Sequence, residues 1–139
     1  MSKLIAIDPK GWGSLKGRPG YAVFNNGVLV ETGNEPHLSA VCDTLVIELP
    51  QVYQHGRSKG DPNDLIRVAF YAGSCTRIGH GVLSTPTPAE WKGQTPKAIC
   101  AERIKAVLAV HELVHLYKAD HNVLDAVGIG LWALGRMPR

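Results

Sequence analysis

Apolar and polar residues follow one another along the chain in a pattern that predicts strands first. Short apolar runs bounded by Pro, Gly or Asn are typical of strands. Such runs predict strands at residues 4–7, 20–24, 27–31 and 44–50. Asn25 and Asn26 separate the second run from the third, and because asparagine tolerates positive φ, these two strands are expected to form a hairpin.

Longer segments in the second half of the chain predict helices. The stretch 61–73 begins with Asp61 as an N-cap and Pro62 at the first helical position. Two more helices are expected, from about 96 to 118 and from about 122 to 135, and the segment 80–97 suits one short strand and then a loop. With strands first, helices later and no repeat or linker, the pattern predicts a single α/β domain over residues 1–139 with a mixed sheet.

Composition narrows the class of protein. The chain has 139 residues, 45% hydrophobic and 19% charged, which is ordinary globular usage. A net charge of +3 permits a polyanionic partner without requiring one. The start lacks the pattern of a signal peptide, and no apolar run is long enough for a membrane span. The scattered Cys42, Cys75 and Cys100 indicate reduced, buried thiols, so a cytoplasmic protein is expected.

The stretch HELVHLYKADH (111–121) raises the question of zinc chemistry. His111 and His115 fit the H-E-x-x-H signature of zinc peptidases, and His121 stands where the extended motif has a third ligand. However, Lys118 replaces the glycine that the extended motif needs, and the two histidines would share a helical face with apolar residues such as Leu108. Locally hydrogen-bonded histidines beside an apolar face are therefore favoured, and a zinc peptidase is the least favoured function.

Three acidic residues suggest a different site. Asp8 closes the first predicted strand, Glu48 lies near the end of the fourth, and Asp125 falls in the first turns of the last helix. Acids at the ends of buried strands break the local pattern, as functional residues often do. If the two strands are neighbours, Asp8 and Glu48 come side by side, and a hard divalent cation such as Mg²⁺ or Mn²⁺ would hold them. Asn122 or His121 could add a further ligand from the same helix.

The order of these motifs resembles the RuvC-type Holliday junction resolvases of the ribonuclease H-like superfamily, in particular their compact phage-encoded branch. The resemblance covers most of the chain and rests on IAIDP, ELPQVYQHGRSKGDPNDLI, PAEWKGQTPK and HNVLDAVGIGLWALGR. It implies a ribonuclease H-like fold, with a five-stranded sheet flanked by helices, a homodimer, and four metal-binding side chains per active site. Three of them carry over onto Asp8, Glu48 and Asp125. The fourth is an Asp or His in the family and falls on Asn122 here, so either Asn122 coordinates through its amide oxygen or His121 takes the role.

The resemblance implies a crossover junction endodeoxyribonuclease that resolves four-way DNA junctions by paired symmetric nicks during recombination, replication and repair. Two Mg²⁺ ions per active site, which Mn²⁺ can replace, would activate a water and stabilise the leaving oxygen. No membrane and no small-molecule cofactor are expected, and a phage-encoded enzyme would act in the host cytoplasm.

Basic and aromatic residues on predicted connections suit contacts to the DNA backbone and stacking on opened bases. The nucleic-acid-binding candidates are Lys10, Trp12, Arg57, Lys59, Trp91, Lys92 and Lys97. A broad apolar arc along the predicted helix 96–118 exceeds what one sheet face would cover, which favours a homodimer that uses part of this helix. Two alternatives remain open: another structure-selective DNA or RNA nuclease of the superfamily, and a non-catalytic nucleic-acid-binding module.

Overall fold

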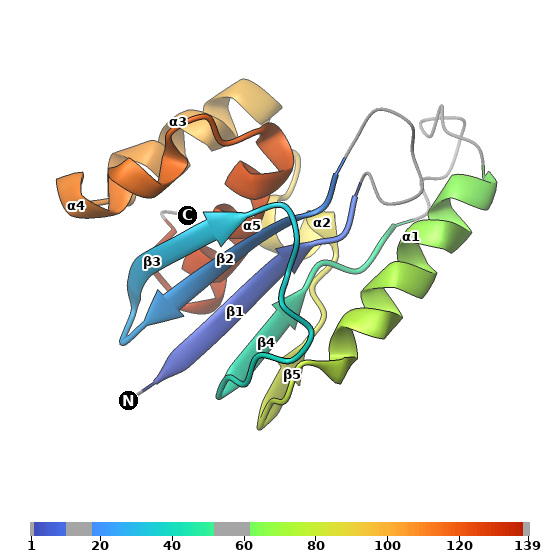
Figure 1. Ribbon diagram of the computed structural model, residues 1–139. Coiled ribbons are helices and arrows are strands. Elements are labelled where there is room, and N and C mark those ends of the chain that lie inside the picture. The colour runs from blue at the N-terminus through green and yellow to red at the C-terminus, as the bar shows by residue number, and fades with distance from the viewer. Residues whose placement is uncertain (1, 11–17, 52–61, 138–139) are drawn as a thin grey trace.

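The chain folds into a five-stranded mixed sheet with helices on both faces (Figure 1). The computed structural model describes residues 2–10, 18–51 and 62–137. The strands are β1 (Lys3–Asp8), β2 (Gly20–Asn25), β3 (Val28–Gly33), β4 (Thr44–Ile47) and β5 (Val82–Ser84). Their order across the sheet is β3-β2-β1-β4-β5, with β1–β2 and β2–β3 antiparallel and β1–β4 and β4–β5 parallel. The predicted α/β class with a mixed five-stranded sheet is therefore confirmed.

The helices occupy mainly the second half of the chain, as predicted. They are α1 (Pro62–Ser74), α2 (Pro88–Lys92), α3 (Lys97–Val107), α4 (Val110–Leu113) and α5 (His121–Ala133), with two 3₁₀ helices, η1 (Cys75–Arg77) and η2 (Val114–Leu116). Pro62 stands at the first position of α1 as expected, whereas the N-cap predicted at Asp61 lies outside the described residues. The segment 80–97 contains the predicted short strand, β5, but its predicted loop also includes the short helix α2.

The β2–β3 hairpin turns one residue later than the sequence suggested. Its two turn residues are Asn26 and Gly27, with φ values of 50° and 82°. Two consecutive residues with positive φ form the type of turn whose twist matches that of paired strands, and Asn-Gly is a favoured sequence for it. The prediction of a connection at Asn25–Asn26 was therefore wrong by one position.

The two faces of the sheet carry separate parts of the core. On one face, Ala6 and Val46 pack with residues of α2, α3 and α5. On the other face, Ile7 and Ile47 pack with residues of α1 and η1. Because side chains alternate between faces along a strand, every second residue of β1 and β4 points toward α5. This alternation decides where the acidic residues at the strand ends point.

The long helix predicted over residues 96–118 is interrupted. Helix α3 ends at Val107, and the next two residues, Leu108 and Ala109, have extended backbone with ψ of 138° and 162°. The Leu108 side chain is buried in the core on the α5 face. Since a second, short helical segment starts only at Val110, residues 99–117 do not form the single continuous apolar face from which the dimer interface was predicted.

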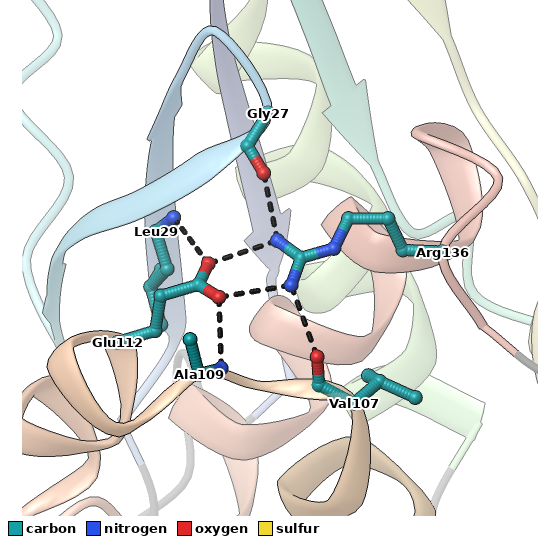
Figure 2. A network of polar contacts seen from close by, with 6 residues as sticks. All are labelled: Gly27, Leu29, Val107, Ala109, Glu112 and Arg136. Carbon is teal, nitrogen blue, oxygen red and sulfur yellow. Dashed lines mark hydrogen bonds and ion pairs between the residues drawn. The ribbon is translucent and has the colours of Figure 1, made fainter.

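An ion pair between the buried Glu112 and the partly exposed Arg136 joins this break to the hairpin and to the C-terminal segment (Figure 2). Arg136 Nη1 and Nη2 lie 2.8 and 2.9 Å from the two carboxylate oxygens of Glu112. The remaining hydrogen bonds of the pair reach backbone groups of Gly27, Leu29, Val107 and Ala109. Glu112 thus fixes the chain between the end of α3 and the start of α4. The hydrogen bonds from Arg136 are the main cause that lowers the pKa of Glu112 from 4.5 to about 2.

The cysteines match the sequence-based expectation of reduced, buried thiols. Cys42, Cys75 and Cys100 are all buried and none forms a disulfide. No helix within the described ranges combines the length and the apolar character that crossing a bilayer requires.

Candidate functional site

Two buried carboxylates lie side by side where β1 and β4 end. The parallel pairing of these strands is continued by a hydrogen bond of 3.0 Å from the Glu48 backbone N–H to the Ile7 carbonyl. Asp8 and Glu48 follow Ala6 and Val46 by two residues each, so both side chains point to the α5 face of the sheet. They are 0% and 1% exposed. The condition named from the sequence, that the first and fourth strands be neighbours, is therefore met.

Helix α5 brings Asp125 and Asn122 to the same place. Asp120 is the N-cap of α5, because its carboxylate accepts a hydrogen bond of 2.9 Å from the Val123 N–H. Residues 122 and 125 are three apart and therefore lie on one face of the helix, and both are buried. Burial is the main cause of the raised pKa of Asp8, and repulsion from Asp125 adds to it.

A glycine allows the close approach of the α5 N-terminus to the sheet. Gly20 is paired with Asp8 across β1 and β2. A Cβ atom at position 20 would lie only 2.2 Å from the Asn122 carbonyl oxygen. Any larger residue would thus push α5 away from β2, and so from Asp8 on the neighbouring strand.

The acids are contacted by groups from two other segments. Lys10, two residues after the end of β1, places its Nζ 3.4 Å from Glu48 Oε1, and its backbone N–H donates to Asp8 Oδ1 at 3.0 Å. The indole N–H of Trp91 donates to Glu48 Oε2 at 2.5 Å. Lys92 places its Nζ 3.6 Å from Asp125 Oδ2.

The sequence around Trp91 and Lys92 explains why they reach the site. Thr87 and Glu90 form a capping box, and Pro88 stands at the first position of α2. Both features stabilise the N-terminus of this helix of only five residues. Trp91 is buried in the core on the α5 face, which fixes the end of α2 against the sheet. The contact from Trp91 to Glu48 was missed by the sequence reasoning, although the T-P-A-E capping signal was present to predict this helix.

The buried acids and the lysines at the site change one another's pKa values. Burial, followed by repulsion from Glu48, raises the pKa of Asp8 from 3.8 to about 8, and the nearby Lys10 offsets only part of this effect. Burial also opposes the charge on Lys10, but the attraction of Glu48, Asp8 and Asp125 outweighs it, so the pKa of Lys10 is raised. With its raised pKa, Asp8 is mostly protonated at pH 7, while Glu48 and Asp125 each face one lysine, so a bound cation would replace the Asp8 proton or a lysine ammonium group.

Two oxygen atoms at the site lack hydrogen-bond donors among the described residues. They are Asp8 Oδ2 and Asn122 Oδ1, and both are buried. The amide of Asn122 is held in place by its other end, since Nδ2 donates to the Arg18 carbonyl at 2.7 Å. Unpaired buried polar atoms are rare, and each calls for an explanation such as an ion.

The donor set fits hard divalent cations. Carboxylate and amide oxygens are the ligands that Mg²⁺ and Mn²⁺ take in proteins, and two such oxygens here have no competing donor. Within the described ranges, no three His, Cys, Asp or Glu side chains already converge on one point as a preformed cage. Instead, Glu48 and Asp125 each face a lysine ammonium group.

The other candidate residues from the sequence are distributed differently. His121 is the first residue of α5 and is exposed, unlike the buried Asn122. Lys97 is exposed at the first position of α3, and not in a loop as predicted. Trp91 is only 5% exposed, so its ring offers no free face for a base to stack on. The candidates Trp12, Arg57 and Lys59 lie outside the described residues.

The HELVH segment does not form the single helix that a zinc peptidase signature requires. His111 lies on α4 and His115 on η2, and the intervening glutamate, Glu112, is only 2% exposed. Both carboxylate oxygens of Glu112 are occupied by Arg136. This glutamate serves the fold and is not free to act as a base.

The chain matches no family model and no curated protein.

Proposed function

We propose that this protein is a metal-dependent endonuclease of ribonuclease H-like fold, similar to the RuvC-type resolvases, which cuts four-way DNA junctions in the cytoplasm. The observation that carries the proposal is the gathering of Asp8, Glu48 and Asp125 from three distant segments where the neighbouring strands β1 and β4 end against α5. Such a cluster of buried acids costs stability unless cations hold it. Bound cations would offset this cost, because they compensate the negative charge of the acids.

The acids would hold two Mg²⁺ or Mn²⁺ ions. When bound, such ions activate a water on one side of a phosphodiester and stabilise the leaving oxygen on the other. Asp8, whose Oδ2 atom has no hydrogen-bond donor among the described residues, would be one of the ligands. Glu48 is oriented by the indole N–H of Trp91, which leaves its other oxygen facing Lys10. Asp125 completes the set from α5.

Asn122 is the better candidate for the fourth ligand. Its Oδ1 atom is buried without a donor, and its Nδ2 atom is anchored to the Arg18 carbonyl. The exposed position of His121 gives it no comparable orientation. An amide oxygen brings no negative charge, so we expect weaker cation binding than a fourth carboxylate would give.

Contacts to the DNA backbone would come from lysines at the rim of the site. The side chains of Lys10 and Lys92 are 41% and 21% exposed, so each can reach both the acids and a phosphate outside. Lys97 is the first residue of α3 and is exposed, so it can contact a phosphate. Their attraction for phosphate does not depend on base sequence, which suits an enzyme that recognises the shape of its substrate.

The dimer proposal rests on an exposed apolar patch, formed by Val110, Leu113, Val114 and Tyr117 of the α4–η2 segment. Tyr117 and Val110 are 81% and 83% exposed, which is unusual for side chains of this kind in a monomer. A four-way junction has two-fold symmetry, and a two-fold dimer would present two identical sites to opposing strands. A second copy of the chain is therefore the proposed occupant of the patch.

A non-catalytic nucleic-acid-binding module is the second candidate. The specific observation in its favour is that Lys10 and Lys92 already pair with Glu48 and Asp125. If these lysines neutralised the acids permanently, the site would bind no cation. Measured binding of divalent cations to the protein decides between the two candidates.

Substitution of the acids tests the proposed chemistry. Asp8→Asn, Glu48→Gln and Asp125→Asn should each reduce the cleavage of a synthetic four-way junction in Mg²⁺ by at least about a hundredfold, while junction binding in EDTA weakens by no more than about threefold. Asp64→Asn is the matched control, because this exposed aspartate on α1 lies in an ordinary surface ion pair. Near-native cleavage by any of the three variants would remove that residue from the catalytic set.

A further inference from the structure

Two lysines occupy the positions at which cations are expected. Lys10 Nζ lies 3.4 Å from Glu48 Oε1, and Lys92 Nζ lies 3.6 Å from Asp125 Oδ2. Strong charge-assisted hydrogen bonds are shorter, at about 2.7–2.9 Å. The lysines are therefore ion-paired with the acids without being locked to them.

The acids are fixed, whereas the lysines can move. Glu48 is 1% exposed and is held by the Trp91 indole, and Asp125 is buried within α5. The lysine side chains are partly exposed, and lysine carries its charge at the end of a flexible four-carbon stem. Each ammonium group can leave its carboxylate without any change in the backbone.

A divalent cation and a lysine cannot both use the same carboxylate oxygen. Like charges about 4 Å apart in a partly buried site repel strongly. A cation that binds Glu48 or Asp125 must therefore displace Lys10 or Lys92 from it. The natural destination is a phosphate of the bound strand, which would offer the ammonium group a new negative partner at the rim of the same site.

We propose that Lys10 and Lys92 are internal counter-ions that compete with divalent cations for the acidic cluster and transfer to phosphate when nucleic acid binds. The phosphate half of this inference rests on the proposed function. The competition makes cation binding and DNA binding mutually reinforcing. A bound cation frees the lysines for phosphate, and a bound phosphate draws the lysines away from the acids. Such coupling is reciprocal by thermodynamic necessity. It would also keep the acids neutralised, and the protein stable, while no substrate is present.

Calcium titration tests the competition directly. Ca²⁺ binding is measured by isothermal titration calorimetry on the wild type, Lys10→Met, Lys92→Met and the double variant, first without DNA. Methionine keeps the length of the stem and removes the charge. We expect each variant to bind Ca²⁺ at least about fivefold more tightly than the wild type. Lys10→Gln and Lys92→Gln repeat the test with a polar replacement, should a methionine variant fold poorly.

Lys3→Met is the matched control. Lys3 begins β1, at the opposite end of the strand from Asp8, and its loss changes the net charge by the same amount. Ca²⁺ affinity in this variant should remain within about twofold of the wild type. An equal gain in the control would mean that net charge alone is responsible, and the competition would be refuted.

The second half of the test adds a four-way junction, which Ca²⁺ is expected to leave uncut. Saturating junction should tighten Ca²⁺ binding to the wild type at least about fivefold, and this gain should shrink in the double variant. Unchanged or weaker Ca²⁺ binding by the lysine variants without DNA would overturn the competition, even if the wild type cuts junctions. Conversely, a wild type that neither binds Ca²⁺ nor cuts junctions in Mg²⁺, beside a double variant that binds Ca²⁺, would support the competition and refute the proposed nuclease.

Discussion

The pair formed by Glu112 and Arg136 makes a quantitative prediction about stability. Arg136→Met removes the two hydrogen bonds to the Glu112 carboxylate and those to two backbone carbonyls, while the side-chain volume is nearly kept. It leaves a carboxylate with a 3% exposed side chain and no cationic partner. Loss of one partner of a buried ion pair typically costs about 3–5 kcal/mol.

The pKa of Glu112 gives a similar magnitude. A fall from 4.5 to about 2 corresponds to about 3 kcal/mol of interaction that favours the charged form in the folded state. Because the folded pKa is the lower one, this contribution is fully present above about pH 5 and is lost as the pH falls toward 2. The wild type should therefore lose stability over this range, and Arg136→Met should lose less, since its glutamate has no depressed pKa.

Urea denaturation followed by circular dichroism measures both effects. At pH 7 we expect Arg136→Met to lower the free energy of unfolding by about 3 kcal/mol. Arg77→Met is the matched control, because Arg77 is exposed at the end of η1 and should change stability by less than about 0.5 kcal/mol. A loss below about 1 kcal/mol for Arg136→Met, or an acid-side pH dependence equal to that of the wild type, would refute the assignment of Glu112 to the fold.

Three further predictions concern the acidic site. Asp8→Asn should raise the free energy of unfolding in EDTA at pH 8 by more than about 1 kcal/mol, because it removes a buried carboxylate charge that Glu48 repels. A loss of stability in urea denaturation would contradict this prediction. Gly20→Ala should destabilise the fold by about 1–3 kcal/mol through its clash with the α5 backbone. Gly73→Ala, with open space around its Cβ, is the control and should be neutral or stabilising, so equal urea midpoints for the two variants would refute the close approach of α5 to Gly20. Asn122→Ala should weaken Mn²⁺ binding, measured from the electron paramagnetic resonance signal of free Mn²⁺, more than His121→Ala does, and the reverse order would make His121 the fourth ligand.

The strands and the relation between the first two acids could be predicted from the sequence alone. Short apolar runs define β1 and β4 directly, and a buried strand leaves few places for an acid except its end. Once the strands are parallel neighbours, the two-residue period places Asp8 and Glu48 side by side on one face. Asp125 follows from the periodicity of α5. These are local patterns, and the fold preserves them.

The interruption after α3 could not be predicted in this way. Residues 99–117 have no proline or glycine to break a helix. The break depends on contacts with residues far away in the chain, namely the burial of Leu108 in the core and the hydrogen bonds of Glu112 to Arg136 and Leu29. Tertiary contacts of this kind override helical propensity, and periodicity carries no information about them.

The role of Trp91 was hidden for a related reason. In the sequence, Trp91 stands directly before Lys92 and near prolines, a setting that also suits an exposed, base-stacking side chain. Only the fold shows that α2 packs on the sheet and directs the indole N–H to Glu48. A tryptophan close to basic residues therefore does not by itself distinguish a DNA-stacking residue from one that orients a carboxylate.

The most direct test of the account is a cleavage assay on a mobile-core four-way junction in Mg²⁺, beside linear duplex, forked DNA and an RNA–DNA hybrid of the same sequence. The account predicts paired nicks in opposing strands of the junction, at a rate at least about tenfold above that on linear duplex, and no cutting in EDTA. Preferential cutting of the hybrid would favour another nuclease of the superfamily. Absence of cleavage in both Mg²⁺ and Mn²⁺, by protein that binds the junction, would contradict the nuclease and leave a nucleic-acid-binding module.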